Sequence, residues 1–248
     1  MSQQVGTLVK ALSLLDALAE SAPVGVMELS RQLKMDKSGV SRLLMTLRSH
    51  NFVRVDEDGR YELGLRLFEL GQILQDRLPF RQTIIPHVEA IARETDETAY
   101  AVHYHHGEIA YLYDCVSNQE IRLGAKTGIR CPPWNHIAGK VILAQLEESS
   151  VERDFQSAKA AGGMRLPSWK DFQSELQEIS KQGFGVDKQD DKFLVAAPLL
   201  NAHSPGGASL IVGGPSFRMK TQQIGRLAKI VINHAAQASQ ALGWMPGG

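Results

Sequence analysis

The residues best suited to chemistry are basic ones, gathered in one short stretch. Residues 31–54 hold six lysines and arginines and one acidic residue, Asp36. The whole chain is balanced, with 27 basic and 27 acidic residues, so it has no general attraction for polyanions. A positive segment in a neutral protein is typical of a phosphate-binding surface, and the alternative is an ordinary solvated basic face.

Three histidines form a second candidate: His103, His105 and His106. The first and second share one face of an expected strand, so a metal site is conceivable. The alternative is a group of partly exposed polar side chains at a hairpin, which is the more common case. We therefore leave metal binding open and expect no metal ligands among the site residues.

Three carboxylates form a third candidate: Asp187, Asp190 and Asp191. They could serve an enzyme that acts on a small organic acid through a metal or paired carboxylates, and the alternative is a solvated loop. The sequence contains no Gly-x-Ser-x-Gly elbow, no Walker loop and no dinucleotide fingerprint. We therefore expect no enzyme, no catalytic residues and no cofactor, and keep such an enzyme as the alternative function.

The basic stretch lies on two expected helices. Val26, Leu29 and Leu33 repeat at helical spacing, and residues 34–36 form a turn. Asp36 or Ser38 can then cap a second helix by accepting from its free N–H groups. The second helix has one apolar face, made of Val40, Leu43, Leu44 and Leu47.

A hairpin follows these helices. Residues 52–55 and 60–63 alternate like strands, and Asp58-Gly59 provides the turn. A helix, a turn, a second helix and a hairpin predict a winged helix-turn-helix, whose second helix enters the DNA major groove. The predicted DNA-binding residues are Lys37, Ser38, Gly39, Ser41, Arg42, Arg54 and Arg60. We expect Arg42 to contact base edges, and Lys37 and Ser38 to hold phosphate.

Residues 29–71 resemble the DNA-binding domain of the isocitrate lyase regulator (IclR) family of bacterial transcription factors. The resemblance rests on the run from Leu29 through Lys37-Ser38 to Leu47, on Phe52-Val53, and on Tyr61-Glu62-Leu63-Gly64. Asn51 stands where the family usually has glycine, and Gly39 where threonine is frequent. The resemblance implies a homodimer or homotetramer that binds a palindromic double-stranded DNA operator as a repressor or an activator.

The chain continues with other expected elements. A helix over residues 7–20 precedes the basic stretch, with Leu8, Leu12, Leu15 and Ala19 in one stripe. A helix over 65–77 follows the hairpin and ends before Pro79, which suits a linker. We expect strands at 98–105, 108–114, 121–126, 184–187, 193–200 and 208–213, and helices at 81–94, 136–146, 150–160, 168–181 and 219–242.

This second part resembles the effector-binding domain of the same family, which is similar to GAF domains. The matching segments are residues 134–144, Gly183-Phe184 with Asp187, residues 195–199, and Gly214-Pro215 with Arg218. The predicted fold is α+β, with a mainly antiparallel sheet in the second domain. The predicted domains are a winged helix-turn-helix at 1–64, a linker helix at 65–80 and an effector-binding domain at 81–248.

The start of the helix at 136–146 suggests an effector site. If Asn135 caps this helix, the first N–H groups lack helical partners, and the helix dipole attracts an anion there. The predicted effector-binding residues are Trp134, His136, Ile137, Ala138, Asp187, Leu194, Ser209 and Ile211. N–H donors beside an aromatic and aliphatic wall suit a small organic acid with an apolar body, aromatic rings included; the alternative is a capped, solvated helix end.

Composition indicates the compartment. The chain is 43% apolar and 22% charged, has two cysteines, and lacks the charged-then-apolar start of a signal peptide. Its apolar runs are too short to span a bilayer. We expect a cytoplasmic protein without a membrane partner. We also expect effector binding to change how two copies of the helix at 65–77 pair.

Overall fold

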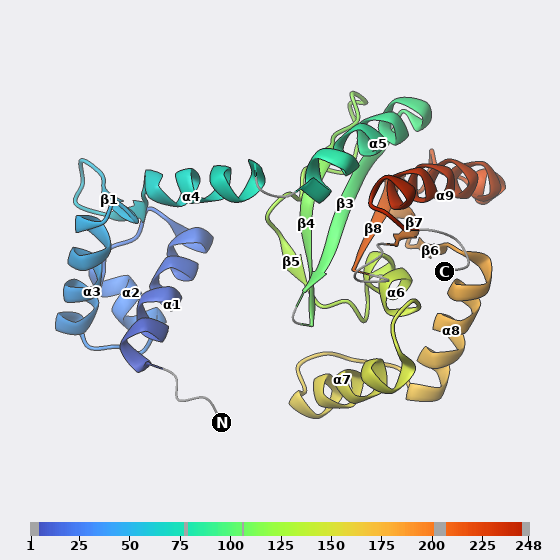
Figure 1. The fold of residues 1–248 in the computed structure, drawn as a ribbon. Coiled ribbons are helices and arrows are strands. Elements are labelled where there is room, and N and C mark those ends of the chain that lie inside the picture. Colours follow the sequence, from blue (N-terminus) through green and yellow to red (C-terminus); the bar gives the residue numbers. More distant parts are fainter. Residues whose placement is uncertain (1–4, 77–78, 106, 201–206, 245–248) are drawn as a thin grey trace. The chain divides into compact units, whose positions relative to one another are not determined.

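The computed structural model describes residues 5–76, 79–105, 107–200 and 207–244 (Figure 1). The chain divides into two compact units, residues 1–78 and 79–248. Each unit has its own apolar core, so each is described separately. The division falls inside the segment predicted to be the linker. His106, the third of the clustered histidines, lies outside the described residues.

The N-terminal unit is a winged helix-turn-helix. Its elements are α1 (Gly6–Ser21), α2 (Val26–Gln32), α3 (Lys37–Ser49), β1 (Val53–Val55), β2 (Tyr61–Leu63) and α4 (Leu65–Asp76). The two strands pair antiparallel, with Arg54 opposite Glu62. Gly59 has a φ of 76°, a left-handed conformation that glycine adopts without strain, which explains the sharp turn. The predicted helices and hairpin are confirmed.

The core of this unit uses a different side of α1 from the predicted stripe. Leu14, Ala17 and Leu18 are buried against α2 and α3, whereas Leu8 is 59% exposed and Leu12 is 52% exposed. The stripe at 8, 12, 15 and 19 reads as amphipathic on its own. Periodicity therefore finds an apolar face without saying which of two apolar faces the protein buries.

The C-terminal unit is built on one sheet. Its strands are β3 (Thr98–His105), β4 (Glu108–Cys115), β5 (Arg130–Cys131), β6 (Gly185–Lys188), β7 (Lys192–Leu199) and β8 (Ala208–Pro215). They lie in the order β5-β4-β3-β8-β7-β6, and every neighbouring pair is antiparallel. Its helices are α5 (Pro79–Thr95), α6 (Ile137–Leu143), α7 (Glu148–Ala161), α8 (Trp169–Gln182), the short 3-10 turn η1 (Thr221–Gln223) and α9 (Ile224–Ala241).

The two faces of this sheet have different covers. Helices α5 and α9 pack on one face, over residues such as Ala99, Val195 and Leu210 (Figure 1). Helix α6 packs on the other face, over Tyr100 and Ile211. Because side chains alternate along a strand, each strand supplies both cores. We call the second surface the α6 face.

The strand predicted at 121–126 is wrong, because that segment has no strand partner. Its backbone is held by side chains of the sheet instead. The Thr98 hydroxyl donates to the Leu123 carbonyl at 2.8 Å, and the Tyr100 hydroxyl donates to the Gly124 carbonyl at 2.9 Å. The Asp114 carboxylate accepts the Lys126 amide at 3.0 Å. These bonds replace a strand ladder, and the strand that pairs with β4 on the side away from β3 is β5.

Candidate functional site

Helix α3 begins at a well-formed cap. The Asp36 carboxylate accepts from the Gly39 amide at 2.7 Å and from the Ser38 hydroxyl at 2.6 Å, which lowers the pKa of Asp36. A side chain at position 39 would collide with this carboxylate. Glycine therefore fits the cap where threonine is frequent in the family. The hydroxyl proton of Ser38 is occupied in the cap, so Lys37 is the better phosphate donor.

The rest of α3 separates a core side from an exposed side. Val40 and Leu44 are fully buried, whereas Lys37 and Arg42 are exposed. Ser41 is half-buried between the two sides. The predicted reading residues thus lie on one accessible surface, which we call the recognition surface.

The two predicted wing arginines are paired with carboxylates. Arg54 Nε lies 2.9 Å from a Glu62 oxygen, and an Arg60 nitrogen lies 3.1 Å from a Glu28 oxygen on α2. Exposed pairs of this kind contribute only about 0–1 kcal/mol, so a DNA phosphate can replace the carboxylate. Asn51, which precedes the wing, has a φ of 60°, a conformation that explains why glycine is usual there.

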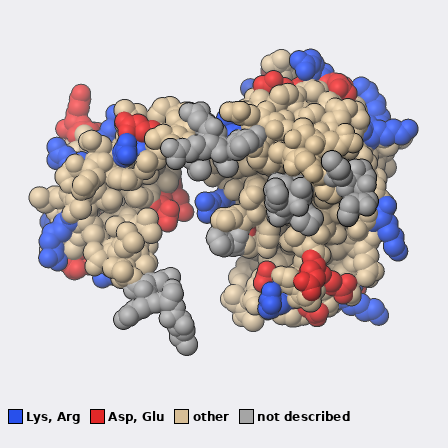
Figure 2. Space-filling view, in the orientation of Figure 1, with Lys and Arg blue, Asp and Glu red and all other residues tan. Residues whose placement is uncertain are grey.

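Sequence reasoning missed Lys10, which lies on α1. Lys10 and Arg42 line the same groove of about 370 Å³ between α1 and α3. The sequence of α1 alone does not indicate that Lys10 lies near Arg42, because the groove depends on how the two helices pack. Figure 2 shows basic side chains on the surface of both units, interspersed with acidic ones.

The predicted effector residues fall into three groups. Ile137, Ala138, Leu194 and Ile211 are buried together in the α6 face. The Ser209 hydroxyl, also buried, donates to the Ala138 carbonyl at 3.2 Å. The structure thus brings these five residues together from α6, β7 and β8.

The predicted Asn135 cap is wrong. The cap of α6 is His136, whose Nδ1 accepts from the Ala138 amide at 3.2 Å. The His136 amide itself donates to the Pro133 carbonyl at 3.4 Å. Of the first N–H groups, which the Asn135 cap would leave free, those of His136 and Ala138 therefore have partners. The Ala138 amide is satisfied because the ring of His136 folds back over the helix start.

The other two predicted residues lie apart. Trp134 is 4% exposed, and its ring centroid lies 5.6 Å from that of Phe155 and 6.0 Å from that of Phe172. This aromatic cluster packs beneath α7 and α8, away from the α6 face. Asp187 faces the α6 side, opposite Leu194 on β7. Its carboxylate accepts from the side-chain amide of Gln189 at 2.9 Å.

A polar group on the α6 face was missed by sequence reasoning. The Tyr111 hydroxyl lies 2.8 Å from His136 Nε2, and the Lys126 ammonium lies 3.5 Å from the same hydroxyl. Burial, followed by the charges of Lys126 and Lys192, lowers the pKa of His136 to about 4. Burial also raises the pKa of both Tyr100 and Tyr111. Alternation along the second strand would have grouped Tyr111 with Tyr113, but a bulge in the pairing with β3 puts Tyr113 on the opposite face.

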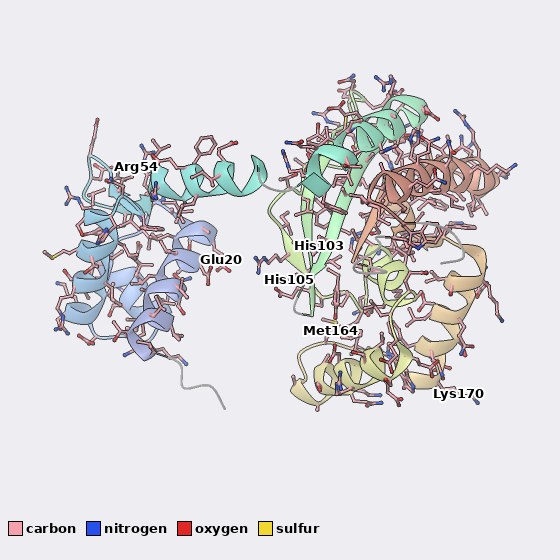
Figure 3. All side chains as sticks on the ribbon, in the orientation of Figure 1. Glu20, Arg54, His103, His105, Met164 and Lys170 are labelled. Atoms are coloured by element: carbon pink, nitrogen blue, oxygen red, sulfur yellow. The ribbon has the colours of Figure 1, made fainter. Side chains whose placement is uncertain are left out.

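The clustered histidines show no metal geometry in the part of the chain that is described. His103 and His105 come from the end of β3 (Figure 3), and their ring centroids are 6.2 Å apart. The ring of His103 also packs against Phe80. Within the described ranges, no three histidine, cysteine or acidic side chains are grouped to hold a metal ion, the acidic loop at 187–191 included.

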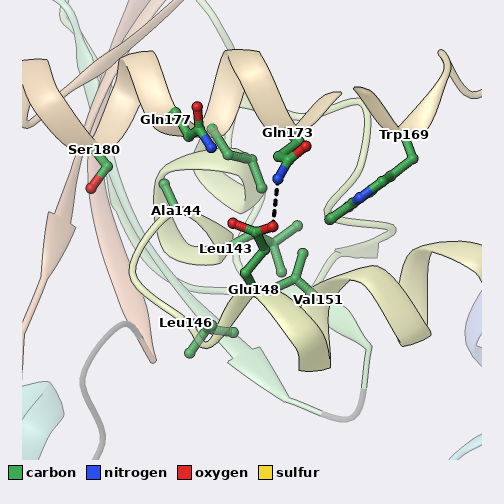
Figure 4. Close-up of a pocket in the computed structure, with 10 residues that line it drawn as sticks. Leu143, Ala144, Leu146, Glu148, Val151, Trp169, Gln173, Gln177 and Ser180 are labelled. Atoms are coloured by element: carbon green, nitrogen blue, oxygen red, sulfur yellow. Dashed lines mark hydrogen bonds between the residues drawn. The ribbon is translucent and has the colours of Figure 1, made fainter. Parts of the chain in front are cut away.

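A second cavity opens between α7 and α8. It has about 220 Å³ and is lined by Leu143, Val151 and Trp169 among others (Figure 4). Its only charged lining residue in the described chain is Glu148, whose carboxylate accepts from the side-chain amide of Gln173. A negative lining disfavours an organic acid, so this cavity does not match the predicted effector. No helix in the described ranges is both long and apolar enough to cross a membrane.

Comparisons with known proteins match both units. The family model for the IclR helix-turn-helix domain matches residues 7–57, and that for the IclR C-terminal domain of bacterial transcriptional regulators matches residues 73–240. The transcriptional repressor IclR of Escherichia coli (strain K12) is 28% identical over 251 residues, which cover 98% of this chain and 92% of the repressor.

Two solved structures show the same fold. The IclR regulator of Alicyclobacillus acidocaldarius has a TM-score of 0.82 and 22% identity, covering 96% of this chain and 99% of that one. An IclR homolog of Microbacterium hydrocarbonoxydans, complexed with 4-hydroxybenzoate, has a TM-score of 0.79 and 17% identity, covering 96% and 99%. The matching family and relatives are named transcriptional regulators, which argues against the alternative function of an enzyme. This chain belongs to the IclR family of bacterial transcriptional regulators.

Proposed function

We propose that this chain binds a palindromic operator in double-stranded DNA. Its affinity for the operator falls or rises when a small organic acid binds the C-terminal unit. The recognition surface supports the first half of the proposal. Arg42 is exposed and has no acidic ion-pair partner in the described chain, so it is free to reach base edges. Lys37, Ser38, Gly39 and Ser41 belong to the first part of the same helix, and Arg54 and Arg60 lie on the wing.

A homodimer, alone or paired into a tetramer, suits the exposed apolar side chains of the N-terminal unit. Leu65 is 67% exposed on α4 and Phe68 is 61% exposed. Leu8 and Leu12 are exposed on α1 as well. Large apolar side chains gathered on a monomer surface mark an interface, and a second copy of the chain would also supply the second half of a palindrome.

The effector belongs, in this proposal, on the α6 face. The residues proposed to bind it are His136, Ile137, Ala138, Leu194, Ser209 and Ile211, with Asp187 at the margin and Trp134 supporting the loop from behind. An apolar surface with a few polar groups is the usual form of a small-molecule site. The homolog of similar fold that was solved with 4-hydroxybenzoate supports an aromatic carboxylate as one suitable class.

Helix α4 is proposed to couple the two activities, because it follows the wing directly and ends near the boundary of the units. Replacing residues 66–74 by a flexible Gly-Ser segment of equal length should preserve operator binding and effector binding but uncouple them. Retained effector control of DNA affinity in that variant would exclude this mechanism.

The experiment that tests the proposed function is selection of DNA from a random library by the purified chain. The expected product is a palindromic sequence whose affinity falls as salt rises, because lysines and arginines displace counterions. Sedimentation of the complex then gives the number of protein chains per site. Selection of no consensus sequence, or of a single asymmetric site bound by one chain, would contradict the proposal.

A further inference from the structure

Lys126 stands beside the Tyr111–His136 pair without a carboxylate partner, and the charge of a second lysine, Lys192, acts on both Lys126 and His136. The Lys126 ammonium lies over the Tyr111 ring at 5.1 Å and over the Tyr100 ring at 6.0 Å. Lys192 precedes Leu194 by two residues on β7, so both side chains face the α6 side. Neither lysine forms an ion pair with an Asp or Glu of the described chain.

The hydrogen bonds leave one further donor at this spot. His136 Nδ1 accepts the Ala138 amide, so its proton is on Nε2, which donates to the Tyr111 oxygen at 2.8 Å. The Lys126 ammonium donates to the same oxygen at 3.5 Å. The oxygen of Tyr111 is thus an acceptor twice, and its own proton remains available to a further acceptor.

The electrostatics make this arrangement costly without an anion. Burial and the charge of Lys192 both lower the pKa of Lys126, and the two ammonium groups also keep His136 neutral. Partly buried charges that lack a partner are expensive and are typical of binding sites. The nearby Asp114 forms no ion pair with either lysine; its Oδ1 accepts from the Lys126 amide and from both donors of Thr127.

The segment that carries Lys126 is held firmly over the sheet. Tyr100 binds the Gly124 carbonyl, and Thr98 binds the Leu123 carbonyl. The Leu123 side chain packs against the apolar cluster of the α6 face, close to Leu194. A cationic side chain on a fixed support next to an apolar wall is preorganised for an amphiphilic anion.

We propose that Lys126, Lys192 and the Tyr111 hydroxyl form the anchor for the acid group of the effector, a small carboxylate whose apolar body lies toward Leu123 and Leu194. This inference rests on the proposed function and moves the anion from the start of α6 to the three donors. An ionised carboxylate can accept from all three donors and balance the ammonium charges, whereas the carbonyl oxygen of its neutral ester can accept a hydrogen bond but carries no charge.

Calorimetry with benzoate, 4-hydroxybenzoate, succinate and the methyl esters of the two aromatic acids tests this. At least one acid should bind wild type at least about tenfold more tightly than its ester, since a charge-assisted contact is worth about 1.5–3 kcal/mol. Lys126→Met and Lys192→Met should each weaken that acid at least tenfold, and Tyr111→Phe several-fold. Lys170→Met, at an exposed position of α8 (Figure 3), should change nothing.

Melting curves without ligand separate an anchor from a structural role. Lys126→Met should melt no lower than wild type, because it removes a partly buried unpaired charge, yet it should lose the rise in melting temperature that the acid gives. A lower melting temperature with unchanged acid affinity would overturn the anchor. Equal binding of acid and ester would also overturn it. So would the absence of binding by any of the acids at about 10 mM. Operator selection would still succeed in those cases, so the regulator itself would stand.

Discussion

The recognition surface and the α6 face are assembled in opposite ways. The recognition surface comes from one helix of 13 residues, capped locally by Asp36, and Lys37 and Arg42, which we propose to contact DNA, are exposed on it. The α6 face joins Tyr100, Lys126 and His136 to residues near 194 and 211, and most of its members are buried. A local surface is specified by spacing in the sequence, whereas a face built from distant strands is specified by register and loop placement.

The mutation with the largest expected effect should disrupt the recognition surface and leave the α6 face intact. Leu44→Ala removes a fully buried side chain from the small N-terminal core and should cost about 2–5 kcal/mol of its stability. Operator binding should disappear while calorimetric effector binding persists. Met45→Ala, on the same helix at an exposed position, is the control and should leave stability within about 0.5 kcal/mol. Loss of both activities in Leu44→Ala would show that the units do not fold independently.

His136 should make the α6 face sensitive to acid. The pKa of His136 falls from 6.5 to about 4 through burial and the neighbouring lysine charges. Between these values the unfolded chain binds a proton that the folded chain does not, so stability is complete above pH 6.5 and declines toward pH 4. The loss should reach about 3 kcal/mol at most. Denaturant melts of wild type and His136→Asn across this range measure it, and equal slopes for the two proteins would contradict the assignment.

A matched pair of glycines tests how tightly α6 is seated. A Cβ at Gly139 would collide with the backbone of Pro133, whereas one at Gly225 in α9 would meet nothing. Gly139→Ala should therefore destabilise the C-terminal unit by about 1–3 kcal/mol. Gly225→Ala should be neutral or stabilise by up to about 1 kcal/mol. Similar melting temperatures for the two variants would show that the loop before α6 yields easily.

The smallest expected effects concern base reading. Arg42→Ala should cost about 1–3 kcal/mol on the selected operator and relax the preferred base at one position. Lys37→Ala should weaken all sequences alike and flatten the salt dependence, because it removes a phosphate contact. Binding titrations against the operator and its single-base variants measure both. Unchanged operator affinity in Arg42→Ala would exclude it as a base-reading residue.

Sequence reasoning succeeded where neighbours along the chain determine the structure. The Asp36 cap, the Gly59 turn and most strands followed from local signals. The strand at 121–126 failed because Thr98, Tyr100 and Asp114 bind that segment from the sheet, and no local pattern reveals such bonds. The cap of α6 failed because asparagine is the more common cap, whereas the ring of His136 reaches its own helix.

The proposed effector site on the α6 face was only partly predictable, because it joins residues that are distant along the chain. Leu194, Ser209 and Ile211, which the resemblance suggested, do lie together on the α6 face, and their role in effector binding stays a prediction. Lys126 was missed since it lies in the segment expected to be a strand, and Lys192 since charged residues at a strand end usually face solvent. The position of Lys126 beside Tyr111 and that of Lys192 on the same face of the sheet depend on the strand order β4-β3-β8-β7, which the sequence patterns alone do not contain.

The central claim is that a carboxylate bound to the C-terminal unit changes the affinity of the N-terminal unit for DNA. The most direct measurement is fluorescence anisotropy of the selected operator, titrated with wild-type protein in the absence and presence of the saturating acid found by calorimetry. We expect a change of about 5- to 150-fold in the dissociation constant. The same dissociation constant with and without the bound acid would contradict it.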